Sequence, residues 1–160
     1  RRWIGEDVYM PTLIGESVGR LVVAIDMSGS IGTEEIGQFL GEVKDICERV
    51  KPEAIDLLYW DTAVCQHEKY EQDQLDNLLS STKPMGGGGT DPHCVWECMI
   101  EEGIEPKKLI MFTDYCFFGW RPQEVESYCD TVWIIKGNPG CEPPHGIWAH
   151  YEEEAAKAGK

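Results

Sequence analysis

Three oxygen-bearing side chains follow a run of apolar residues near the start of the chain. In the stretch VVAIDMSGSIG, Asp26, Ser28 and Ser30 stand two residues apart. Side chains alternate between faces along an extended strand, but a loop that opens onto a helix can gather alternate residues around one point. Hydroxyl and carboxylate oxygens of limited total charge suit Mg²⁺. The spacing therefore indicates a candidate cation site beyond the end of a strand.

Two further oxygen-bearing residues stand in comparable places later in the chain. Thr90 follows four consecutive glycines in GGGGTDP, and Asp114 ends the segment LIMFTD. A glycine-rich loop can approach other backbone closely because glycine accepts positive φ. An alternative interpretation is that the hydroxyls cap helices and the aspartates only end strands. Capping accounts for each hydroxyl alone, but not for two aspartates that end buried strands.

The segments around these residues alternate between strand and helix patterns. Nearly continuous apolar runs, typical of strands covered on both faces, predict strands at residues 20–26, 54–64, 107–114 and 131–137. A more polar segment predicts an edge strand at residues 65–71. Helical spacing or composition predicts helices at residues 32–50 behind a Thr33 cap, 72–81 (a short helix or turn), 93–103, 121–129 and 147–159.

This alternation predicts an α/β fold, with a doubly wound, Rossmann-like, mostly parallel sheet and helices on both faces. In such sheets ligands bind beyond the carboxyl ends of the strands, where the strand order reverses. A length of 160 residues favours a single domain, with residues 1–19 as an N-terminal arm and residues 20–160 as the core. A first residue other than methionine leads us to expect a fragment of a longer protein.

The net charge restricts the classes of expected partner, and the cysteine content indicates the cellular compartment. A net charge of -15 repels nucleic acid and anionic lipid, and no apolar run is long enough to cross a membrane. Seven cysteines are an odd number, so a complete disulfide framework is excluded and a reducing, cytoplasmic location is favoured. Cys94 and Cys98, beside His93, have a spacing compatible with zinc, but no second ligand pair is evident and packed thiols are the favoured interpretation.

The motifs DMSGS, GGGGTDP and FTD, in this order, resemble the metal ion-dependent adhesion site (MIDAS) of von Willebrand factor A (VWA) domains, over roughly residues 20–136. The resemblance implies Mg²⁺, or Mn²⁺ or Ca²⁺, as the bound ion. It implies that Ser28, Ser30 and Thr90 are direct or near-direct ligands and that Asp26 and Asp114 act mainly through bound water. It also implies an open coordination position for an acidic residue of a protein partner. One departure is DYCFFGW, where many members have Asp-Gly.

A closer resemblance, to one type of VWA-like domain, rests on the segments RR, MPTL, LVVAIDMSGSI, GGGGTDP and PPHGIW. Together these segments are similar to the VWA-like domain at the C-terminus of predicted metallopeptidases of bacteria and phages. In those proteins an N-terminal domain carries a His-Glu-x-x-His zinc motif, which is missing from this sequence. The resemblance implies a protein-interaction domain without catalytic activity of its own, and it makes the metallopeptidase domain of the same polypeptide a candidate partner.

Two alternative functions stay open at this point. DMSGS is similar to the nucleophile motif of haloacid-dehalogenase-like phosphatases, which would make the protein a metal-dependent phosphohydrolase. Those enzymes need a second acid where Ser28 stands, so the general acid is missing. The other alternative is a structural VWA domain with no functional metal. A P-loop is excluded, because no Lys-Ser/Thr pair follows the four glycines.

Overall fold

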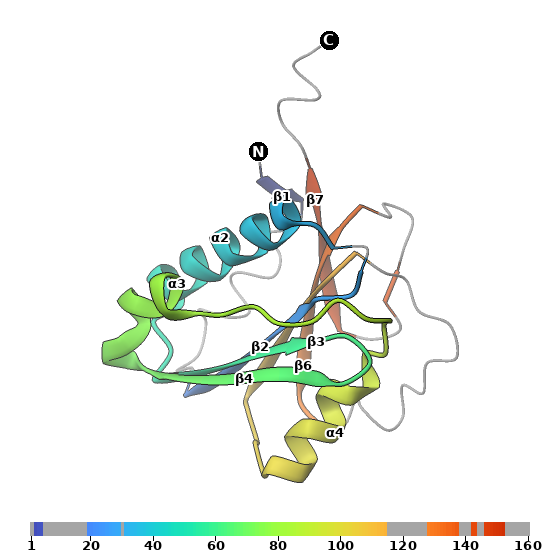
Figure 1. Ribbon diagram of the computed structural model, residues 1–160. Coiled ribbons are helices and arrows are strands. Elements are labelled where there is room, and N and C mark those ends of the chain that lie inside the picture. The colour runs from blue at the N-terminus through green and yellow to red at the C-terminus, as the bar shows by residue number, and fades with distance from the viewer. Residues whose placement is uncertain are drawn as a thin grey trace.

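One mixed sheet lies at the centre of the computed structural model, which describes residues 2–4, 19–29, 31–114, 128–137, 142–143 and 146–152 (Figure 1). Within these ranges seven strands pair in the order β1-β7-β6-β5-β2-β3-β4. Their bounds are β1 Arg2–Ile4, β2 Arg20–Asp26, β3 Ala54–Trp60, β4 Val64–Glu71, β5 Lys108–Thr113, β6 Asp130–Lys136 and β7 Ile147–Glu152. The five inner strands are mutually parallel, whereas β4 and β1 join the two edges antiparallel.

Helices cover both faces of this sheet. The described helices are α2 Thr33–Val50, the 3-10 helix η1 Gln72–Asn77, α3 Leu78–Ser81 and α4 His93–Glu102. Figure 1 shows α2 and α3 on one side of the sheet and α4 on the other. The prediction of a doubly wound α/β fold with a mostly parallel sheet is confirmed. None of the described helices is long and apolar enough to cross a membrane.

Two hydrophobic cores follow from the alternation of side chains along the strands. On β2, Leu21, Val23 and Ile25 face the core under α2, whereas Val22 and Ala24 face the core under α4. All five side chains are fully buried. A central strand with helices on both sides has no polar face, because each face of the sheet must be covered by apolar side chains. This burial explains the continuous apolar run in the sequence.

Three details of the predicted elements are corrected by the structure. The prediction of a helix at residues 147–159 is wrong for its first part, since β7 occupies Ile147–Glu152 and pairs with β6 and β1. The predicted second strand ends at Trp60, and residues 61–63 form a turn. Helix α2 begins at Thr33, and its N-cap residue is Gly32, whose backbone N–H donates to Glu35 Oε1 at 2.9 Å. The prediction that Thr33 caps the helix is therefore wrong. The predicted helix at residues 121–129 lies almost entirely outside the described residues.

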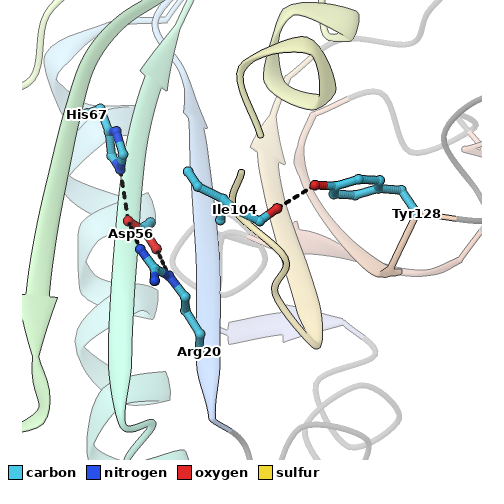
Figure 2. A network of polar contacts seen from close by, with 5 residues as sticks. All are labelled: Arg20, Asp56, His67, Ile104 and Tyr128. Carbon is cyan, nitrogen blue, oxygen red and sulfur yellow. Dashed lines mark hydrogen bonds and ion pairs between the residues drawn. The ribbon is translucent and has the colours of Figure 1, made fainter. Parts of the chain in front are cut away.

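A buried polar network crosses the sheet at β2, β3 and β4 (Figure 2). Asp56 on β3 is fully buried and accepts hydrogen bonds from the Arg20 guanidinium and, at 2.8 Å, from His67 Nε2. Burial alone would raise the pKa of Asp56, but the hydrogen bonds and positive charge from Arg20 and His67 lower it. The network therefore keeps a charged carboxylate inside the α4 side of the sheet.

Candidate functional site

The predicted site begins where β2 ends. Asp26, the last residue of β2, is fully buried. Its Oδ1 accepts the backbone N–H of Ser28 at 2.8 Å, and its Oδ2 accepts the hydroxyl of Thr113 at 2.6 Å. The first bond bends the chain so that Ser28 follows as a buried residue of the loop. These two bonds hold the carboxylate in one orientation at the edge of the sheet.

Asp114 lies beside this carboxylate because β5 is the direct neighbour of β2. The chain passes from β2 to β3 on one side and returns to β5 on the other side, so the strand order reverses between β2 and β5. Asp114 directly follows β5 and is half-buried. The carboxyl ends of strands at such a reversal form the usual ligand crevice of this fold class. The sheet thus brings Asp26 and Asp114 together.

The electrostatics of Asp26 reflect this environment. Burial raises the pKa of Asp26, the hydrogen bonds from Ser28 and Thr113 oppose the rise, and the negative charge of Asp114 adds to it. Ionising Asp26 in the folded protein therefore costs free energy. A cation between or near the two carboxylates would offset that cost.

The glycine loop at residues 86–89 lies directly against the loop after β2. The N–H of Gly29 donates to the carbonyl of Gly88 at 2.9 Å. At Gly86, where φ is +152°, an added Cβ would stand 2.5 Å from Cβ of Met27. Only a residue without a side chain permits this approach. The glycines are therefore needed to bring the Thr90 segment next to the DMSGS segment.

Asp61, which the sequence analysis did not select, organises the same loop. It directly follows β3, and its Oδ2 accepts the N–H of Gly88 at 3.0 Å. Its backbone carbonyl accepts the N–H of Asp91 at 2.8 Å. An aspartate at the end of a strand is the signal that indicated Asp26 and Asp114. The strand predicted at residues 54–64 contains Asp61 in its interior, so that signal did not apply to Asp61.

The structure describes four of the five predicted site residues. Asp26, Ser28 and Asp114 lie around the ends of β2 and β5, and half-buried Thr90 lies in the loop that contacts Gly29. Ser30 lies outside the described residues. That these five side chains share one ion stays a prediction. Thr113, the hydroxyl donor to Asp26, is an additional residue that only the β2 and β5 pairing reveals.

The chemistry of these residues fits a hard divalent cation. Every described donor is an oxygen, from two carboxylates and two hydroxyls, and oxygen ligands are what Mg²⁺, Mn²⁺ and Ca²⁺ take. Among the described residues, no three His, Cys, Asp or Glu side chains lie together as a metal site. A site at Asp26 would therefore depend on its hydroxyls as well as on its two carboxylates.

The zinc alternative at α4 receives no support from the surroundings of its thiols. Cys94 is buried in the core under α4, and Cys98 packs against that core. Burial, followed by nearby acidic residues, raises the pKa of both thiols. A protonated thiol is a poor metal ligand. Packed thiols are thus the interpretation that fits these two residues.

Replacing Gly86 with alanine should lower the free energy of unfolding by about 1–3 kcal/mol, because the new methyl group overlaps Met27. Gly87→Ala is a matched control, since Gly87 also has positive φ (+134°) but an added Cβ there has no neighbour within 4 Å. Urea denaturation of both variants measures the difference. Equal losses would mean that backbone strain alone, and not the contact with Met27, requires glycine here.

Comparison with known families gives a match over most of the chain. Residues 21–151 match a family model described as VWA-like domain (DUF2201). The matched region begins within β2 and ends within β7, so it includes every predicted site residue. A search of curated proteins found no match.

Proposed function

Because this chain belongs to the VWA-like domain family, we propose that it is a metal-dependent protein-interaction domain. It binds Mg²⁺, or Mn²⁺ or Ca²⁺, in the manner of a MIDAS, and through that ion it binds an acidic residue of a protein partner. The residues that hold the ion are Asp26, Ser28, Ser30, Thr90 and Asp114. The domain itself has no catalytic role in this proposal.

The observation that carries the proposal is the pair of carboxylates at the strand-order reversal. Asp26 is fully buried, and the charge of Asp114 contributes to its raised pKa. Two like charges at one buried edge are unfavourable unless an opposite charge accompanies them. The hydrogen bonds from Ser28 and Thr113 orient Asp26 without neutralising it. This arrangement supports a site whose charge is balanced by a cation.

Each part of the chain contributes a separate role. Asp26 and Asp114 supply negative charge, and Ser28, Ser30 and Thr90 supply neutral oxygens that limit the total charge. When bound, the metal ion supplies a positive charge and a coordination position for a carboxylate oxygen of the partner. The chain has a net charge of -15, so an acidic partner would otherwise be repelled. Binding is therefore expected to depend strictly on the metal.

The partner that we propose is the metallopeptidase domain of the same polypeptide, or a protein that acts with it. This part of the proposal rests on the sequence resemblance described above. A pull-down from the native host, in Mg²⁺ and in EDTA, tests it directly. A metallopeptidase recovered only in Mg²⁺ supports the assignment. The same set of proteins in both conditions contradicts recruitment through a metal.

Millimolar Mg²⁺ should raise the melting temperature of the isolated chain relative to EDTA. A ligand that binds only the folded state adds RT ln(1 + [L]/Kd) to its stability, which is about 2.7 kcal/mol at 100 times Kd. Asp26→Asn should lose this effect, because it removes one of the two carboxylates. Differential scanning calorimetry over a graded Mg²⁺ series measures the shift. Superimposable melting curves with Mg²⁺ and EDTA would favour a structural domain without functional metal.

No phosphatase activity is expected from this chain. Ser28 occupies the position where a phosphohydrolase of the alternative class needs its second acid, and a serine hydroxyl does not protonate a leaving group at neutral pH. The measurement is release of nitrophenol from an aryl phosphate in Mg²⁺. Turnover that disappears in Asp26→Asn would establish the enzyme alternative instead.

A further inference from the structure

We propose that Asp61 is a positioning residue that sets where Thr90 stands relative to the loop after β2. Asp61 directly follows β3, the strand next to β2 on the side away from β5. It belongs to none of the three segments predicted to hold the ion. Its hydrogen bonds nevertheless reach the GGGGTDP segment directly, and the DMSGS segment through Gly88. The proposal deepens the proposed function and, for its metal-binding part, rests on it.

Asp61 fixes the chain on both sides of Thr90. On the N-terminal side, its Oδ2 accepts the N–H of Gly88 at 3.0 Å. On the C-terminal side, its backbone carbonyl accepts the N–H of Asp91 at 2.8 Å. Two hydrogen bonds from one residue therefore hold the short segment that contains Thr90 against the end of β3.

Gly88 is hydrogen-bonded both to Asp61 and to the loop after β2. The N–H of Gly88 binds Asp61, and its carbonyl accepts the N–H of Gly29 at 2.9 Å. Gly29 lies directly after Ser28 in the DMSGS segment. Asp61, Gly88 and Gly29 thus form a chain of hydrogen bonds from β3 through the glycine loop to the loop after β2. The spacing between Ser28 and Thr90 depends on that chain.

Asp61 is itself held firmly enough to act in this way. Its Oδ1 accepts the N–H of Ala63 at 3.2 Å and that of Thr62, and its own N–H donates to the carbonyl of Ala63 at 3.0 Å. The carboxylate is consequently fixed by its own turn before it reaches Gly88. Desolvation raises the pKa of Asp61, but the hydrogen bonds from backbone N–H groups outweigh it and lower the pKa, so the group accepts as a carboxylate.

The approach of the loop to Asp61 also requires glycine at position 88. A Cβ added to Gly88 would stand 2.9 Å from Oδ2 of Asp61 and 3.4 Å from its carboxyl carbon. By contrast, a Cβ added to the neighbouring Gly87 has no atom within 4 Å. The glycine run therefore contains one position that packs on Asp61 and one beside it that does not. This difference gives a matched pair of variants.

The central variant is Asp61→Asn. The amide oxygen can still accept from Thr62 and Ala63, but an NH₂ group then faces the N–H of Gly88, and that hydrogen bond is lost. Asp76→Asn, on η1, removes the same charge from an exposed position away from the loop. Partners that orient metal ligands typically change metal affinity by 10–100-fold when they are replaced.

Two measurements separate positioning from general stability. The first is amide hydrogen exchange at Gly88 in EDTA, which should be at least about tenfold faster in Asp61→Asn than in Asp76→Asn, while amides of β2 and β5 exchange unchanged. The second is the dissociation constant of Mn²⁺, measured by electron paramagnetic resonance. It should rise by about tenfold in Asp61→Asn, with the same number of ions bound at saturation. A loss of stability alone would leave this constant unchanged.

The outcomes distinguish the two levels of the proposal. If wild type binds no Mn²⁺, the proposed function fails, and the exchange of the Gly88 amide alone decides whether Asp61 positions the loop. If wild type binds and Asp61→Asn binds equally well, the role of Asp61 is overturned while the proposed function stands. Should Asp61→Asn fail to fold, Gly88→Ala replaces it, with Gly87→Ala as control. Weaker Mn²⁺ binding in Gly88→Ala alone supports the role, and equal binding in both contradicts it.

Discussion

Replacing Asp56 with alanine is expected to lower the free energy of unfolding by about 3 kcal/mol. The side chain is fully buried and binds both Arg20 and His67 (Figure 2). Removing it leaves the Arg20 guanidinium and the His67 ring without their shared partner inside the sheet. Removing one partner of a buried ion pair typically lowers the free energy of unfolding by about 3–5 kcal/mol. We expect a value at the lower end of this range because the Arg20 side chain is partly exposed. Urea denaturation at pH 7 gives the value.

Asp45→Ala is the matched control for this loss. Asp45 pairs with Arg49 one turn away on α2, at 3.4 Å, and both side chains are exposed. An exposed pair at this spacing contributes about 0.3–0.5 kcal/mol. A loss at Asp56 no larger than the loss at Asp45 would show that the buried network contributes little to stability.

The same network predicts a pH dependence with a definite sign. Because the folded pKa of Asp56 lies below its ordinary value, the folded state binds this proton less tightly than the unfolded state. The stabilisation is present in full above the unfolded pKa of about 3.9 and is lost as the pH falls through the folded pKa. The difference in stability between wild type and Asp56→Asn should therefore be constant above about pH 5 and shrink below about pH 4.

Thr90→Ala is expected to abolish the stabilisation that Mg²⁺ gives to wild type, a loss of about 2.7 kcal/mol at 100 times the wild-type Kd. The hydroxyl of Thr90 is the one predicted ligand that comes from the glycine loop. Without it, the proposed site keeps two carboxylates and too few neutral oxygens. Thr90→Ser retains the hydroxyl and should retain most of the effect. Calorimetry in Mg²⁺ and in EDTA compares the three proteins.

The fold of Thr90→Ala should remain intact, because Thr90 is only half-buried and neither core contains it. Far-UV circular dichroism in EDTA checks this. Metal-dependent stabilisation that persists in Thr90→Ala but is absent from Asp26→Asn would remove Thr90 from the proposed ligand set. It would leave the site at the ends of β2 and β5 in place.

The sequence alone was sufficient for the inner strands β2, β3, β5 and β6, and it indicated the three segments of the candidate site. The apolar run that forms β2 is buried on both faces, and such burial constrains composition strongly enough to be read without a structure. Asp26 and Asp114 are indicated by the sequence because each is a charged residue at the end of an apolar run. Their proximity also followed from general rules, since carboxyl ends of neighbouring parallel strands meet at one edge.

Segment 147–152 shows where local pattern fails. Its neighbour in sequence is the run EEEAAKA, whose residues favour helix, and the helical prediction was extended back over it. In the structure β6 presents an open edge, and β7 satisfies the backbone groups of that edge while burying Ala149. Pairing with β6 and β1 decides the conformation of this segment, in agreement with the strand preference of Ile147, Trp148 and Tyr151, which the helical run after it obscured.

What the sequence determined by itself is the class of the fold, because alternating strand and helix patterns set it, and the oxygen chemistry of the candidate site, because two aspartates end buried strands. What only the tertiary structure decided is how those residues are held. Thr113 donates to Asp26 from 87 residues away, and Asp61 binds Gly88 from 27 residues away. Such hydrogen bonds leave no periodic pattern in the chain, since each needs one polar atom at one point in space. They exist only once β2, β3 and β5 have paired in register.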